Sequence, residues 1–147
     1  MKALEWYDAG TKAIDPIEKF TNFWRGFNYL FFRECGRDER RKIRSFLGRM
    51  LDETAAQKLL ALHETQIDYL LSQPVVDMRG NGKDTRKNID AFNSATSSMR
   101  KVEESFMVIY QVRCNLEHGQ KSPSSARDVR LCECAAPIVA QVIHDYA

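Results

Sequence analysis

The sequence predicts an all-α protein, a helical bundle of about five helices. Apolar residues recur every three to four positions through most of the chain, as on the buried face of a helix. Helix-start signals such as Asp15-Pro16 precede these runs, and no segment has the pattern of a strand. With 147 residues, 44% of them hydrophobic, the chain is long enough to bury a real core, so we expect one domain over residues 1–147.

The first predicted helices follow from capping residues and aromatic spacing. Asp15-Pro16 predicts a helix from Pro16 to about Glu34, in which aromatic residues form one core-facing stripe. Gly26 within it would permit another helix to approach closely. Asp38 predicts a second helix to about Leu51, and a third covers Thr54–Ser72.

A loop and the longest helix come next. Glycine and proline predict a loop over Gln73–Asp84. Its Gly80-Asn81-Gly82-Lys83 run lacks the full phosphate-loop pattern, so we expect no nucleoside triphosphate there. A long helix is predicted from about Thr85 to His118, where Gly119 ends it. A last helix starts within Ser122–Ser125 and runs to Tyr146, with a kink or break at Pro137.

Composition narrows the class of protein. No apolar run approaches the roughly 20 residues that span a bilayer, so we expect no membrane partner. The first residues include acids where a signal peptide needs an apolar stretch, which favours a cytoplasmic location. The four cysteines lack the spacing of a zinc site. We therefore expect reduced thiols, and neither a metal ion nor another cofactor.

Residues 33–49 concentrate positive charge, although the formal net charge of the chain is only +2. The simpler interpretation is a solvated helix face. The alternative is a surface that follows phosphate groups and helps to hold nucleic acid. The basic side chains are Arg33, Arg37, Arg40, Arg41, Lys42, Arg44 and Arg49, against Glu34, Asp38 and Glu39.

An arginine and a histidine, Arg113 and His118, stand at the end of the long helix. The arginine fork matches phosphate, and histidine moves protons near neutral pH. Such a pair at a phosphodiester indicates RNA cleavage without a metal. Five residues turn a helix by roughly 140°, so the two side chains do not share a face automatically. The simpler alternative is an exposed ion pair between Arg113 and Glu117, with His118 as a helix-terminal residue.

The residues around this pair resemble the HEPN superfamily of small helical-bundle proteins, which carry an R-x4-6-H motif. The resemblance rests on Ile109–Pro123 followed by Arg127-Asp128, and the aromatic segment Phe23–Phe31 is similar to an early helix of the family. It implies a metal-independent endoribonuclease of toxin or defence type, active as a homodimer whose two motifs meet at one cleft. Carried over by position, Arg113 and His118 are the catalytic pair.

The proposed chemistry follows from these two groups. His118 would take the proton from a ribose 2′-OH or give one to the leaving 5′ oxygen. Arg113 would stabilise the charge on the phosphate. The product would be a 2′,3′-cyclic phosphate, and DNA would be resistant.

Other positions of the motif bear on substrate and regulation. Asn115 matches a family asparagine, and we expect it and Lys121 to bind the RNA substrate. Cys114 stands where active members commonly have a polar residue, which favours the alternative of a non-catalytic HEPN-like module that binds RNA, a nucleotide or a protein. A purely structural bundle is a third alternative. Gln120 stands where some antitoxin-paired members have tyrosine, which argues against modification at this site. An antitoxin protein is a possible partner.

Overall fold

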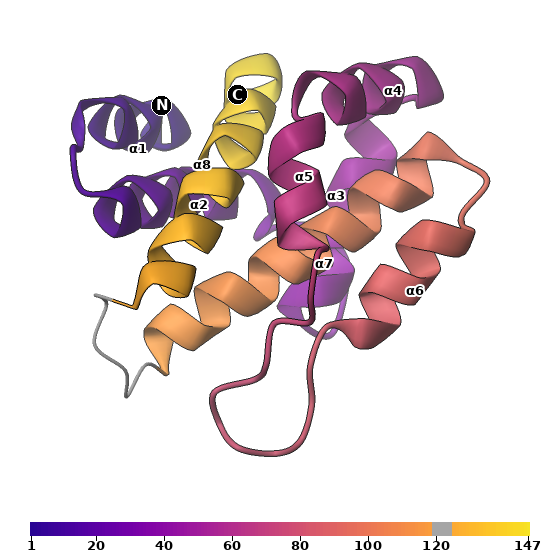
Figure 1. Ribbon diagram of the computed structural model, residues 1–147. Coiled ribbons are helices and arrows are strands. Elements are labelled where there is room, and N and C mark those ends of the chain that lie inside the picture. The colour runs from indigo at the N-terminus through magenta and orange to yellow at the C-terminus, as the bar shows by residue number, and fades with distance from the viewer. Residues whose placement is uncertain (119–124) are drawn as a thin grey trace.

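The computed structural model describes residues 1–118 and 125–147, and this part of the chain is all-α, as the sequence predicts. Figure 1 shows α7 crossing the molecule, with α1, α2 and α8 toward its C-terminal end and α4 and α6 toward its N-terminal end. The helices are α1 (Lys2–Lys12), α2 (Pro16–Phe31), α3 (Glu39–Met50), α4 (Glu53–Leu62), α5 (Glu64–Leu70), α6 (Arg86–Ser94), α7 (Ser98–Glu117) and α8 (Ala126–Tyr146).

The described residues form eight helices rather than about five, and α1 is one reason. This helix packs closely on α2 through two glycines. A Cβ atom added to Gly26 would lie 2.9 Å from the carbonyl oxygen of Ala3, and one added to Gly10 would lie 2.5 Å from the Phe23 ring. The close helix approach expected at Gly26 is therefore confirmed, and α1 is the helix that makes it.

Two predicted helices are each divided in two. The segment predicted over Thr54–Ser72 turns at His63, whose backbone (φ −117°, ψ 27°) separates α4 from α5. The segment predicted from Thr85 to His118 is interrupted at Ala95, which is extended. Ser97 then caps α7 by accepting a hydrogen bond from the Arg100 amide at 3.1 Å. These turns let α4, α5 and α6 pack against α7 and α8.

The carboxylate caps are confirmed. Asp15 accepts a hydrogen bond from the Glu18 amide at 2.9 Å, with Pro16 in the first turn. Asp38 accepts one from the Arg41 amide at 2.9 Å. Each cap satisfies an amide that the helix itself leaves without a partner. These two signals locate the starts of α2 and α3 correctly.

Of the kink or break predicted at Pro137, the break is absent, because α8 is one continuous helix from Ala126 to Tyr146. Proline removes one backbone hydrogen bond, but the neighbouring Ala136 and Ile138 are buried in the core and hold the helix on both sides. The start predicted within Ser122–Ser125 is partly outside the described residues, as is the helix stop at Gly119. The described helix begins after Ser125.

One hydrophobic cluster runs through the bundle, and an aromatic group lies at its centre. Phe27 packs against Phe31, Phe46 and Phe106 with ring centroids 5.0–5.9 Å apart. The core-facing aromatic stripe predicted for α2 is therefore confirmed. All four cysteines are free, and burial raises the pKa of Cys132 to about 12. Among the described helices, none is long and apolar enough to cross a membrane.

A carboxylate, Glu104 of α7, is enclosed by this core with only 1% of its side chain exposed. Arg44 of α3 binds both of its oxygens, at 3.0 and 3.2 Å. Arg100 contacts it at 2.7 Å, and Asn88 of α6 donates to it at 2.9 Å. Buried charge of this kind needs such partners, so Glu104 ties α3 and α6 to α7.

Candidate functional site

Arg113 lies in the last turns of α7, where two carboxylates flank its guanidinium. Its Nη2 is 2.8 Å from Glu117 Oε1, one helical turn further along. Its Nη1 is 3.9 Å from Glu39 Oε2, at the start of α3. The ion pair that sequence spacing suggested between Arg113 and Glu117 is therefore present. The contact with Glu39 joins residues far apart in the sequence and was not predicted.

The guanidinium of Arg113 is only partly used by these contacts. It has five N–H donors, and within the described residues one of them makes a hydrogen bond, to Glu117. The Glu39 contact is an ion pair without a hydrogen bond, and Glu39 Oε2 is buried with no hydrogen-bond partner in the described structure. The Arg113 side chain is 23% exposed. It can therefore present a further edge to an anion.

His118 is the C-terminal cap of α7. Its backbone has left the helical conformation (φ −91°, ψ 9°), and its amide donates to the Cys114 carbonyl at 3.0 Å. The residue is exposed at the end of the helix. Arg113 and His118 make no hydrogen bond with each other, although both are described. Within one chain, Arg113 and His118 thus lie at the same end of α7 without a hydrogen bond between them.

A cavity of about 430 Å³ lies beside Arg113, between α2, α7 and the first turns of α8. Its apolar wall includes Trp24, whose indole Nε1 is buried and has no hydrogen-bond partner in the described structure. Arg113, Glu117 and Asp128 supply charged groups to its edge. The remaining lining residues are Ile17, Phe20, Thr21, Arg25, Met78, Val112, Asn115, Leu116 and Leu131.

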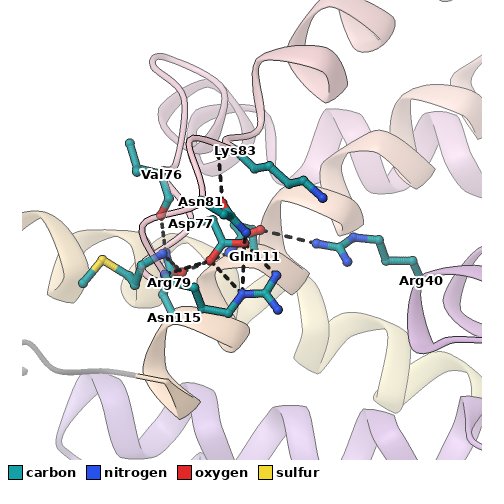
Figure 2. Close-up of polar contacts among 9 residues, drawn as sticks. Arg40, Val76, Asp77, Arg79, Asn81, Lys83, Gln111 and Asn115 are labelled. Carbon is teal, nitrogen blue, oxygen red and sulfur yellow. Dashed lines mark hydrogen bonds and ion pairs between the residues drawn. The ribbon is translucent and has the colours of Figure 1, made fainter.

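The side-chain amide of Asn115 forms hydrogen bonds within the protein. Its Oδ1 accepts from the Met78 amide at 3.1 Å and from Gln111 Nε2 at 2.9 Å, while its Nδ2 donates to the Val76 carbonyl at 2.8 Å. Figure 2 shows Asn115 and Gln111 beneath the loop that precedes α6. In this structure Asn115 attaches the loop to α7. Its expected role in RNA binding stays a prediction, and Lys121 lies outside the described residues.

The loop predicted over Gln73–Asp84 is confirmed, and it has a defined conformation. Asp77 is 4% exposed, and its carboxylate binds the Arg79 guanidinium, the Arg79 amide and Asn81. These contacts, the Arg79 side chain first, hold the pKa of Asp77 well below its usual range. Gly80 and Gly82 have φ values of 73° and 76°, a region that favours glycine. The tip is thus a tightly bonded turn.

Arg40 reaches the same part of α7 from α3. Its Nη2 donates to Gln111 Oε1 at 3.3 Å, and its guanidinium carbon lies 4.7 Å from the centroid of the Tyr110 ring. Burial, followed by the contact with Cys114, raises the pKa of Tyr110, so the phenol stays neutral under the arginine. Sequence reasoning placed Arg40 in a basic stretch but gave no signal for this long-range contact.

In residues 1–118 and 125–147, no group of three or more His, Cys, Asp and Glu side chains is arranged to hold a metal ion. Comparison with protein-family models, with curated proteins and with solved structures found no significant match to this chain.

Proposed function

We propose that this protein is a metal-independent endoribonuclease of the HEPN type, which cleaves RNA by attack of a ribose 2′-OH. The observation that carries the proposal is the position of Arg113 and His118 at one end of α7, with Arg113 on the edge of a cavity of about 430 Å³. Arginine supplies a fork for the phosphate. Histidine supplies a group that exchanges protons at neutral pH.

In the proposed reaction, the 2′ oxygen forms a bond to phosphorus while the bond from phosphorus to the 5′ oxygen breaks. A base removes the 2′-OH proton and an acid protonates the leaving 5′ oxygen, and His118 serves in one of these two roles. Arg113 binds the non-bridging oxygens as their charge grows. The products are a 2′,3′-cyclic phosphate and a 5′-OH, so no water or metal enters the cleavage step.

A homodimer would complete such a site. Within one chain the two groups are roughly 140° apart around the helix and make no hydrogen bond with each other, so each needs a complementary group from elsewhere. A two-fold axis close to the end of α7 would bring a second arginine and a second histidine to the same cleft. Sedimentation should then give about twice the 17.0 kDa of one chain, and specific activity should fall on dilution.

The test of the proposed activity is cleavage of single-stranded RNA in excess EDTA. Arg113→Ala and His118→Ala should each lower kcat/KM by about 10² or more. His144→Ala and Lys58→Ala are matched controls, because His144 is exposed in the last turn of α8 and Lys58 is exposed on α4, and they should retain full activity. A substrate with 2′-deoxyribose at the cleavage position should be resistant. Equal activity in all four variants would refute the assignment.

A second candidate function is RNA or nucleotide binding without cleavage. The observation in its favour is the 2.8 Å contact between Arg113 and Glu117, which partly neutralises the guanidinium. Cys114 adjoins it where a polar residue would be expected in an active member. Under this alternative the wild-type protein binds RNA, and Arg113→Ala weakens that binding, but no cyclic phosphate product forms.

A further inference from the structure

Three cationic side chains gather over the side of α7 that carries Gln111. Arg40 extends from α3 toward the loop, and Lys83 extends from the loop toward Arg40 (Figure 2). Arg79, from the same loop, is held by Asp77 next to Gln111 and Asn115. All three residues are exposed. Two separate segments of the chain therefore direct positive charge into one space.

Most of this charge has no counter-ion. Arg79 pairs with Asp77 at 2.8 Å. Arg40 contacts only the neutral Gln111 and Tyr110 side chains, and neither Arg40 nor Lys83 forms an ion pair with a carboxylate of the described residues. The undescribed residues 119–124 contain no acid, so the rest of the chain offers none either. An anion bound at these side chains would supply the missing counter-charge.

Three other basic residues of the 33–49 stretch behave differently, because each binds another part of the protein. Arg44 binds the buried Glu104, and Arg49 binds Glu34 at 2.6 Å. Lys42 donates to the Phe32 carbonyl at 3.1 Å. These three side chains make contacts that stabilise the fold. Arg40 is distinguished by pointing away from its own helix toward the cations of the loop.

The protein holds this cluster in place before any ligand arrives. Arg40 is fixed by its Gln111 hydrogen bond and by the Tyr110 ring. The loop is closed beneath its tip by the Asp77 amide, which donates to the Lys83 carbonyl at 2.9 Å. Asn115 then attaches the loop to α7. The Lys83 side chain still has to be ordered on binding, and the prior ordering of Arg40, Arg79 and the loop backbone favours affinity.

We propose that Arg40 and Lys83, assisted by Arg79, form a phosphate-binding site that holds the RNA strand next to the cleavage motif. The proposal rests on the proposed function. Guanidinium and ammonium groups bind phosphodiester oxygens whatever the base. Two connections place the site next to the motif. Arg40 directly follows Glu39, which contacts Arg113. Asn115, which attaches the loop that carries Lys83, lies between Arg113 and His118 in the sequence.

The test measures binding of a single-stranded RNA with 2′-fluoro substitutions, which cannot be cleaved, as a function of salt. Arg40→Gln/Lys83→Gln removes two phosphate contacts. The slope of log affinity against log salt should then fall by about 1.4, and affinity at ~0.1 M salt should fall about 25-fold. Single-stranded DNA should show the same change, because the contacts are to phosphate. Lys12→Gln/Lys58→Gln removes the same charge from exposed sites on α1 and α4 and should change affinity by about twofold at most.

Each outcome decides the proposal. Lys83→Gln alone removes an exposed side chain that makes no hydrogen bond or ion pair with residues 1–118 and 125–147, so the fold remains and the slope should fall by about 0.7. If wild-type protein cleaves RNA but the Arg40 and Lys83 variants bind with unchanged slope, the phosphate site is wrong and the endoribonuclease proposal stands. If Lys12→Gln/Lys58→Gln loses as much affinity as Arg40→Gln/Lys83→Gln, the loss is caused by the change in net charge, and the phosphate site is again wrong. If wild-type protein neither binds nor cleaves RNA, both proposals fail.

Discussion

Replacing Glu104 by glutamine tests whether a buried carboxylate fastens α3 and α6 to α7. The substitution preserves the size of the side chain and removes its charge. Glu104 is 1% exposed and has four polar contacts, to Arg44 twice, Arg100 and Asn88. Glutamine can accept some of these bonds, but its NH₂ group faces donors. Arg100 loses its counter-ion, and Arg44 keeps only Glu103.

The expected cost follows from these partners. Breaking a buried ion pair typically costs about 3–5 kcal/mol, because the remaining charge is left inside without compensation. Here Arg44 and Arg100 are 31% and 54% exposed, so water can solvate part of their charge. We therefore expect a loss at the lower end of that range, about 3 kcal/mol in the free energy of unfolding. For a chain of this size, that lowers Tm by about 6–12 °C.

Glu103→Gln is the matched control. This neighbouring carboxylate is 20% exposed and contacts only Arg44, at 3.3 Å. The same chemical change should cost less than about 1 kcal/mol, as for other exposed pairs. Urea denaturation of both variants gives the comparison. If the two variants lose equal stability, or if Glu104→Gln loses less than Glu103→Gln, the described network does not hold the helices together.

The Glu104 network also sets the direction of a pH effect. Burial by itself would raise the pKa of Glu104, but the hydrogen bonds from Arg44 and Asn88 and the arginine charges lower it overall. A lowered pKa means that the network stabilises the fold fully above the unfolded-state pKa of about 4.3 and that this stability is lost as pH falls through the folded-state value. The gap between wild type and Glu104→Gln should be constant near neutral pH and narrow below about pH 4.

Two further predictions concern the end of α7. Glu117→Gln should raise kcat/KM for RNA by up to about fivefold at low salt, because an exposed pair contributes up to ~1 kcal/mol and its loss frees the Arg113 guanidinium; a decrease would show that Glu117 positions Arg113. Asn115→Ala should detach the loop, because it leaves the Met78 amide and the Val76 carbonyl without their partners. The expected loss in the free energy of unfolding is about 1–3 kcal/mol. Faster hydrogen exchange at the Met78 amide would confirm this, and unchanged exchange would contradict it.

Features of the fold that depend on residues close together in the sequence could be predicted. The caps Asp15 and Asp38 and the aromatic stripe of α2 each depend on neighbours within four residues, and all are confirmed. Their physics is local, since a side chain binds the amide three residues on or lies on the face set by the helical period. The division between α6 and α7 had a local signal too, the polar run before Ser97.

Contacts between segments that are distant in the sequence could not be predicted in the same way. Glu104 is flanked by Glu103 and Ser105, so its neighbours do not mark it as the buried carboxylate, and its partner Arg44 is 60 residues away. Nothing in the pattern of α3 distinguishes Arg44, which binds that carboxylate, from Arg40, which faces the loop. The basic stretch therefore allowed both interpretations, and only the packing of α3 against α7 assigns each arginine its own environment.

The motif itself shows how helical geometry divides residues that sequence proximity groups together. Arg113 and Asn115 are two apart, which places them roughly 200° apart around α7. Arg113 accordingly contacts Glu39, while Asn115 bonds to the loop, although both residues line the cavity. Glu117, four residues on, returns to the side of Arg113 and binds it. The group that most directly controls the charge at Arg113 is therefore Glu117, and the amide of Asn115 acts on the phosphate site by fixing the loop that carries Lys83.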